Sequence, residues 1–208
     1  MRGDIEASFL EKGHYPAGVD EVGRGCLAGP VYAACVILDY KKLMSVDDKS
    51  KALIRDSKTL SHKQRELIVP LIKEIAIDFK ISFATAREIE KINILQASFL
   101  AMSRAAQACT MDYDILLVDG NKEIPTYKAP QMAIIKGDDH CYNIAAASIL
   151  AKEARDSFMA KAAVKYPEYG FEAHVGYATK KHIDMVNAHG ICELHRRTFG
   201  PIRKLLEK

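Results

Sequence analysis

The fold of this chain can be worked out from the stretch Gly18-Val19-Asp20-Glu21-Val22-Gly23-Arg24-Gly25. Two adjacent carboxylates lie inside an apolar, strand-like run, and a glycine-rich turn with one arginine follows them at once. An ionised carboxylate in apolar surroundings is costly unless a positive charge compensates it. Two of them side by side therefore indicate a bound cation, for which a metal ion is the simplest candidate.

Composition is that of an ordinary globular protein. The chain has 208 residues, of which 49% are hydrophobic and 27% charged, and this length suits one domain with a sizeable core. The net charge of +3 does not by itself indicate nucleic acid. Basic residues outnumber acidic ones from Lys152 onward, which fits a positive binding face and a solvated helical surface equally well.

Cysteine usage and hydropathy bear on the compartment. The five cysteines are scattered without a CxxC pair, which argues against a disulfide framework or a cysteine-based zinc site. We see no signal peptide, and no segment approaches the roughly 20 apolar residues that cross a bilayer. We expect a cytoplasmic protein with no membrane partner.

The pattern of apolar residues predicts an α/β domain with a mixed sheet. Strands are expected at 17–22, 31–38, 79–83, 115–118 and 132–135. Helices are expected from a capping box at Ser61 to Ile75, with Pro70 kinking or interrupting it, and at 93–109 and 144–166. A polar loop is expected at 39–58, a polar N-terminus before the first strand, and one or two helices from Tyr169 onward. The first strands are close enough for hairpins, whereas the later ones need crossovers.

Three of the predicted strands contain acids or lead into them: Asp20 with Glu21, Asp119, and Asp138. Sites in α/β sheets gather at strand ends, so these four carboxylates can converge. Hard oxygen ligands suit Mg²⁺ or Mn²⁺, and a pair of such ions is the common device for phosphodiester cleavage. Taken singly, Asp119 reads as a turn residue and Asp138 as a loop or cap acid. Asp20 and Glu21 inside a strand have no such ordinary explanation.

Other chemical motifs are weaker. Residues 23–28 satisfy the G-x-G-x-x-A dinucleotide fingerprint, but a strand follows where that motif needs a helix. There is no G-x-S-x-G and no H-E-x-x-H, and the pair Cys192 and His195 is only half a zinc site. Tyr177, taken alone, is more often explained by core or surface packing.

Together these motifs resemble bacterial ribonuclease HII, the type 2 ribonuclease H. The matching segments occur in the family's order over nearly the whole chain: GVDEVGRG, DSKTLS, INIL, LLVDGN, IIKGD, IAAASILAK with RD, YGF, H-x-GY and HRRTFGP. The resemblance implies the ribonuclease H fold as one catalytic domain over 1–208, with residues from about 168 to 208 as a helical C-terminal extension. It also implies a metal-dependent endonuclease that acts on ribonucleotides in duplex DNA and on RNA–DNA hybrids, with a part in ribonucleotide excision repair.

The resemblance also implies residue roles. The four metal-binding acids of the family fall on Asp20, Glu21, Asp119 and Asp138. The turn that senses the ribonucleotide 2′-hydroxyl falls on Gly23, Arg24 and Gly25, and the tyrosine that stacks on the neighbouring deoxyribose falls on Tyr177. That hydroxyl is the one group separating RNA from DNA. Further residues lie in family motifs and are expected to contact phosphates: Lys58, Lys136, Ser148 and Lys152.

This chain departs from the family pattern at three positions. Cys26 replaces a common proline, Val175 a frequent lysine, and Glu153 an apolar residue. None removes a catalytic group, and the loss of one positive charge at Val175 predicts weaker DNA affinity beside Tyr177.

We expect hydrolysis on the 5′ side of the ribonucleotide by a monomeric endoribonuclease, which leaves a 3′-hydroxyl and a 5′-phosphate. The sequence does not choose between Mg²⁺ and Mn²⁺, and it shows no peptide for docking on a replication clamp. The alternatives are a DNA-cleaving nuclease on the same fold, a non-catalytic nucleic-acid-binding protein and, more distantly, a dehydrogenase.

Overall fold

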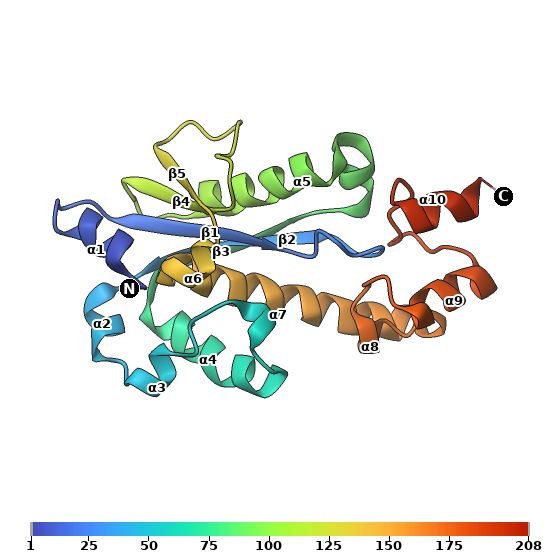
Figure 1. Ribbon diagram of the computed structural model, residues 1–208, viewed down its shortest axis with the longest axis horizontal. Coiled ribbons are helices and arrows are strands. Elements are labelled where there is room, and N and C mark those ends of the chain that lie inside the picture. The colour runs from blue at the N-terminus through green and yellow to red at the C-terminus, as the bar shows by residue number, and fades with distance from the viewer. Residues whose placement is uncertain (1, 208) are drawn as a thin grey trace.

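A five-stranded mixed sheet forms the centre of the computed structural model, which describes residues 2–207 (Figure 1). The strand order is β3-β2-β1-β4-β5. The bounds are Pro16–Val22 for β1, Val31–Leu38 for β2, Ala76–Ala84 for β3, Ile115–Asp119 for β4 and Gln131–Ile134 for β5. β1 and β2 form the predicted hairpin, and β3 pairs antiparallel with β2 after a long connection that contains helices; β4 runs parallel to β1, and β5 parallel to β4. All five predicted strands and the mixed sheet are confirmed.

Helices cover both faces of this sheet (Figure 1). Helix α5 (Ala86–Ala108) lies along one face, and α7 (Tyr142–Lys165) with α4 (His62–Ile75) along the other. The remaining helices are α1 (Asp4–Leu10), α2 (Tyr40–Ser45), α3 (Asp48–Lys51), α6 (Gly137–His140), α8 (Phe171–His174), α9 (Lys180–His189) and α10 (Gly200–Leu206). Short 3₁₀ turns occupy Ser57–Thr59 and Pro167–Tyr169. The C-terminal helices, drawn in red, sit at the end of the sheet that the β1–β2 loop reaches.

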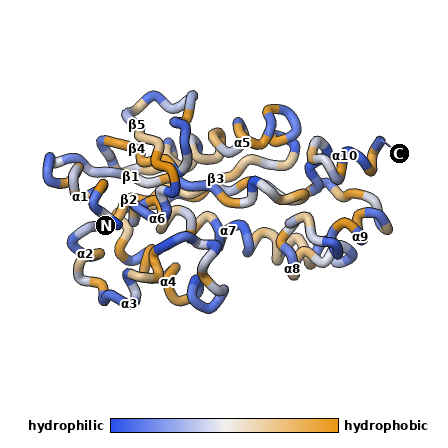
Figure 2. The backbone as a smooth tube through the Cα atoms, viewed as in Figure 1, coloured by the Kyte–Doolittle hydropathy of each residue, from blue (hydrophilic) through white to orange (hydrophobic). Residues whose placement is uncertain are grey.

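Alternation along the strands builds two core layers. Successive strand side chains point to opposite faces. Ala33 and Cys35 of β2 therefore pack with α5, while Ala34 and Val36 pack with α7 and α4. Figure 2 shows hydrophobic positions along the central strands and hydrophilic ones in the connecting loops. Burial on both faces explains why these strands read as nearly continuous apolar runs.

Asn143, fully buried, fixes the start of α7 against the sheet. Its side-chain amide donates to the Pro16 carbonyl at 2.9 Å, and its carbonyl oxygen accepts from the Leu38 N–H at 3.1 Å. A Cβ on Gly18 would lie 2.4 Å from the Asn143 backbone, so glycine is required for this close approach. This contact sets where the rest of α7 lies beneath β1.

Several predicted boundaries are wrong. Helix α5 begins at Ala86 and not at 93. Thr85 is its N-cap and forms a capping box with Glu88 in the first turn. Asn93 has a φ of 65° and caps the second part of this helix by accepting from the Gln96 N–H, so the predicted start is an internal break. α4 continues through Pro70 without interruption.

The polar segments also hold more structure than expected. The predicted N-terminal coil contains α1, and the predicted loop at 39–58 contains α2, α3 and the start of a 3₁₀ turn. Asp39 and Asp47 cap α2 and α3 with their side chains. Beyond Tyr169, the described residues form three helices, not one or two. None of the helices within residues 2–207 is long and apolar enough to cross a membrane.

Candidate active site

Asp20 and Glu21 lie near the end of β1 and, because strand side chains alternate, face opposite sides of the sheet. Asp20 points toward α7, where the Ser148 hydroxyl is a hydrogen-bonding neighbour, and it is only 5% exposed. Glu21 points toward α5 and pairs with the Arg24 guanidinium at 3.1 Å. The two acids thus bracket the strand end.

Asp119 ends β4, and Asp138 lies in the short helix α6 that follows β5. β4 runs parallel to β1 with Val118 opposite Val19, so Asp119 ends its strand beside Asp20. Asp119 Oδ1 accepts from the Gly137 N–H at 2.8 Å. That bond joins Asp119 to the first turn of α6, which carries Asp138. Parallel strands ending at one edge bring together acids that lie far apart in the chain.

All four carboxylates have raised pKa values. Burial is the first cause for each, and repulsion from neighbouring carboxylates adds to it. The pKa of Asp20 is well above its ordinary value, with Glu21 and Asp119 as repelling neighbours. Burial and repulsion from Asp119 bring the pKa of Asp138 to about 6. Burial likewise brings the pKa of Glu21 to about 6, against the attraction of Arg24. The site therefore carries concentrated negative charge that favours a cation.

A cavity of about 250 Å³ opens between α5 and two of the acids, Glu21 and Asp119. Glu21, Arg24 and Asp119 line its polar side, and Phe99 and Met102 of α5 line the apolar side. Buried carboxylate oxygens beside such a cavity are the donors that Mg²⁺ and Mn²⁺ prefer, so the donor set fits a hard divalent ion. Among residues 2–207, no three His, Cys, Asp or Glu side chains are already arranged as a metal-ligand set in this conformation.

The glycine-arginine-glycine turn follows β1 directly. Gly23 has a φ of +96°, a backbone conformation that L side chains rarely adopt. A Cβ at Gly23 would lie 2.2 Å from Arg155 Nε, so this position is closed to side chains. Arg24 and Gly25 are exposed at the tip of the turn. Gly23 therefore allows the backbone conformation that this turn needs, and the next two residues face solvent.

Tyr177 is brought next to this turn. The Gly176 carbonyl accepts from the Leu27 N–H at 2.8 Å, and Cys26 is a hydrogen-bonding neighbour of the Tyr177 hydroxyl. Tyr177 is 38% exposed, and the Arg155 guanidinium lies 6.0 Å from the centre of its ring. The two elements expected to read the ribose and the deoxyribose are therefore neighbours.

The four expected phosphate contacts lie in different settings. Lys58 is exposed, and its pKa is raised because attraction from Asp56, Asp20 and Asp138 outweighs burial. Lys136 is exposed just before α6. In contrast, Ser148 is buried and hydrogen-bonded to Ser57 Oγ at 2.9 Å.

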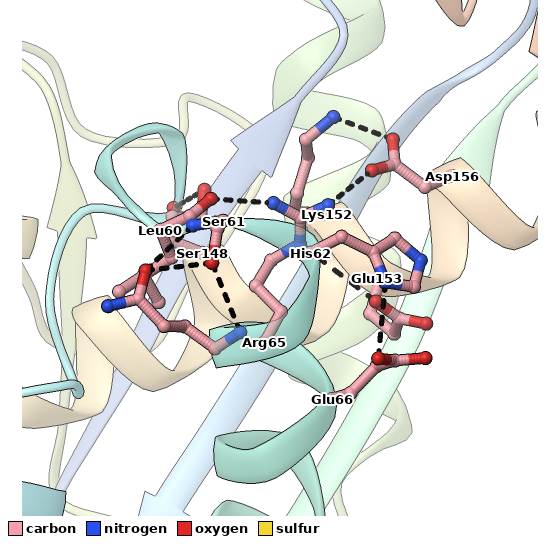
Figure 3. A network of polar contacts seen from close by, with 11 residues as sticks. Leu60, Ser61, His62, Arg65, Glu66, Ser148, Lys152, Glu153 and Asp156 are labelled. Carbon is pink, nitrogen blue, oxygen red and sulfur yellow. Dashed lines mark hydrogen bonds and ion pairs between the residues drawn. The ribbon is translucent and has the colours of Figure 1, made fainter. Parts of the chain in front are cut away.

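Lys152 is the fourth, and it belongs to a network that joins α4 to α7 (Figure 3). Its Nζ pairs with Asp156 at 2.6 Å, and its side chain is 13% exposed. Arg65 of α4 binds the other oxygen of Asp156 at 3.0 Å, and it approaches Glu153 at 3.9 Å. Glu153 therefore faces a partner guanidinium.

Sequence reasoning missed three residues at this site. Asp56 lies in the quoted segment DSKTLS and is close enough to raise the pKa values of Asp119 and Asp138. Arg155 and Arg196 lie in the quoted segments RD and HRRTFGP, and both are fully buried against the carbonyls of the β1–β2 loop. The motifs were visible, but nothing local indicates that these side chains point inward.

The chain is similar to known proteins over nearly its whole length. The family model for Ribonuclease HII matches residues 17–201. Ribonuclease HII of Endomicrobium trichonymphae is 46% identical over 205 residues, covering 98% of this chain and 94% of the relative. Ribonuclease HII of Chlorobium chlorochromatii (strain CaD3) is 45% identical over 208 residues and covers both chains fully.

Solved structures agree with this assignment. The ribonuclease H2 of Pyrococcus horikoshii OT3 has a TM-score of 0.77 at 26% identity, covering 92% of this chain and 97% of the other. Bst-RNase HIII in complex with Mn²⁺ has a TM-score of 0.71 at 18% identity, covering 93% and 70%, and so supports the fold alone. The matched family, the shared ribonuclease H-like fold and the converging acids lead to one conclusion: the chain belongs to the ribonuclease HII family, whose members are endoribonucleases acting on RNA–DNA hybrids.

Proposed function

We propose that this protein hydrolyses the phosphodiester on the 5′ side of a ribonucleotide embedded in duplex DNA, and the RNA strand of hybrids, to give 3′-hydroxyl and 5′-phosphate ends. The observation that carries the proposal is the convergence of Asp20, Glu21, Asp119 and Asp138 beside the Gly23–Gly25 turn and Tyr177. Concentrated carboxylates beside a cavity supply the cation site, and the adjacent turn and aromatic ring supply selectivity.

The four acids would hold Mg²⁺ or Mn²⁺, and divalent ions at such a site stabilise the charge that develops on the scissile phosphate. The raised pKa values support this role, because ionised acids in a buried setting repel one another and a divalent ion would offset that repulsion. Ser148 is a hydrogen-bonding neighbour of Asp20, and Asp119 accepts from the Gly137 N–H. These bonds orient the oxygens that would face the ions.

Two elements would distinguish the ribonucleotide from the deoxyribonucleotide next to it. Gly23, Arg24 and Gly25 would meet the 2′-hydroxyl of the ribonucleotide, and the exposed ring of Tyr177 would stack on the deoxyribose next to it. Lys58 and Lys136, both exposed near the acids, would contact phosphates without sequence selectivity. Ser148 and Lys152 have protein partners, so we propose that they position Asp20 and α7, respectively, and reach phosphate only through those roles.

We propose that the protein acts as a monomer in the cytoplasm, in the repair of ribonucleotides left in DNA.

The direct test is cleavage of an end-labelled DNA duplex carrying one ribonucleotide, beside an all-DNA control, with Mg²⁺, Mn²⁺ or chelator. A single metal-dependent cut immediately 5′ of the ribonucleotide is the expected result. Cutting of both duplexes would refute the selectivity assigned to the turn and Tyr177. Absence of cutting with either metal would refute the proposed reaction.

A further inference from the structure

Two buried guanidinium groups lie beneath the Gly23–Gly25 turn. Arg155 and Arg196 are both 0% exposed, and neither is ion-paired to a carboxylate among residues 2–207. The nearby Cys26 and Tyr177 both have pKa values raised first by burial, so neither supplies a negative charge at neutral pH. Burial and repulsion from Arg155 lower the pKa of Arg196 only to about 10, which leaves it charged. Buried cations without an anion are costly and need an explanation.

The guanidinium of Arg196 donates hydrogen bonds to backbone carbonyls of the β1–β2 loop. Its Nη2 donates to the Gly23 carbonyl at 2.7 Å, and its Nη1 donates to the Arg24 carbonyl at 2.8 Å. Its Nε donates to the Gly29 carbonyl at 2.9 Å. The ring of Phe199 lies 5.1 Å from the guanidinium carbon. Three carbonyls of one loop are therefore turned toward a single side chain.

The direction of these carbonyls decides where the amides point. In a trans peptide the C=O and the N–H of the same unit point in opposite directions, and no peptide bond of the described chain is cis. Because Arg196 holds the Gly23 and Arg24 carbonyls inside, the N–H groups of Arg24 and Gly25 face outward. Neither N–H donates to an acceptor within residues 2–207, and both residues are exposed. Two adjacent free donors thus stand at the tip of the turn.

Arg155 holds the rest of the loop. Its Nη2 donates to the Ala28 carbonyl at 3.1 Å, and its Nε donates to the Pro30 carbonyl at 3.2 Å. Its Nη1 is buried without a partner, on a guanidinium that lies 6.0 Å from the ring centre of Tyr177. The loop, Tyr177 and the C-terminal segment that carries Arg196 are therefore fixed to one another.

We propose that Arg196 is a positioning residue for ribonucleotide selectivity, holding the Gly23 and Arg24 carbonyls so that the Arg24 and Gly25 amides donate to the ribose of the substrate. This inference rests on the proposed function, and it gives the C-terminal extension a role in selectivity. The fork geometry matters here beyond the charge, because three carbonyls in different directions need three separate N–H groups.

The test compares Arg196→Lys, which keeps the charge and loses the fork, with Arg197→Lys, the same change at the exposed neighbouring position. Single-turnover cleavage of the one-ribonucleotide duplex gives its half-saturation concentration. An uncut all-DNA duplex of the same sequence, added as competitor, gives its inhibition constant. Selectivity is the ratio of the inhibition constant of the all-DNA duplex to the half-saturation concentration of the one-ribonucleotide duplex. We expect the ratio to fall about tenfold in Arg196→Lys, the worth of about one hydrogen bond, and to stay unchanged in Arg197→Lys.

An unchanged ratio in Arg196→Lys, or a parallel loss of both affinities, would overturn the inference. If wild type itself fails to cut at the ribonucleotide, or cuts both duplexes, it is the proposed function that fails. A second measurement needs no variant. In the amide NMR spectrum of the wild-type protein with chelator, the Arg24 and Gly25 signals should differ between the ribonucleotide-containing and all-DNA complexes, and identical signals would overturn the inference even if Arg196→Lys does not fold.

Discussion

Two glycines of one turn should respond in opposite ways to the same substitution. At Gly23, alanine meets both a positive φ of +96° and the Arg155 side chain, whose Nε and Cδ would lie 2.2 and 2.7 Å from the new Cβ. The strained backbone costs about 1–3 kcal/mol. Moving Arg155 also weakens its bonds to the Ala28 and Pro30 carbonyls, each worth about 1.5–3 kcal/mol for a charged donor.

We therefore expect Gly23→Ala to lower the free energy of unfolding by about 3–5 kcal/mol, a large share of the roughly 5–15 kcal/mol that holds a domain folded. Gly25→Ala is the matched control, because nothing lies within 4 Å of its added Cβ and its φ is not positive. That change should leave stability unaltered or raise it by about 0.4–1 kcal/mol through the unfolded chain. Urea unfolding followed by circular dichroism measures both. A loss below about 1 kcal/mol for Gly23→Ala, or equal losses in the two variants, would refute the steric reasoning.

Three further predictions concern the acids and the departures from the family. Asp20→Asn should nearly abolish ribonucleotide cleavage while duplex binding by fluorescence anisotropy persists, and normal turnover would remove Asp20 from the mechanism. Because the pKa values of Glu21 and Asp138 are raised to about 6, the folded protein in chelator binds protons more tightly than the unfolded chain, so this site's contribution to stability is lost as pH rises from about 4 to 6. The melting temperature of wild type minus that of Asp138→Asn should fall over that range in chelator and recover with Mg²⁺ at neutral pH; a flat difference would contradict the repulsion. Val175 is a β-branched residue with a φ of 42°, so Val175→Asn should raise the free energy of unfolding by about 1 kcal/mol, because asparagine tolerates this conformation better. Val175→Lys should give a smaller gain in stability but tighter DNA binding. Equal DNA affinity for the two variants would mean that charge at this position is unimportant.

Features that depend on a few neighbouring residues could be predicted from the sequence. The strands were recognisable because burial on both faces leaves nearly continuous apolar runs, as in Ile115–Asp119. The capping box of Thr85 and Glu88 is an equally local signal, but the apolar pattern from Asn93 onward predicts a later start than the helix has. The short helices α2 and α3 were missed since their polar sequences resemble loops, although Asp39 and Asp47 are good caps.

For the candidate site, the sequence alone predicts the four acids: Asp20 and Glu21 stand out inside an apolar strand, while Asp119 and Asp138 follow other strand-like runs and fall in motifs that resemble the family. Tertiary structure decided everything that depends on direction. It showed that Asp20 and Glu21 face opposite sides of the sheet, that Lys152 is paired with Asp156, and that Ser148 supports Asp20. It also brought Arg196 to the carbonyl of Gly23, 173 residues away. Such a contact leaves no local signal, because a guanidinium on a surface and one that holds a distant backbone loop are the same residue until the chain is packed.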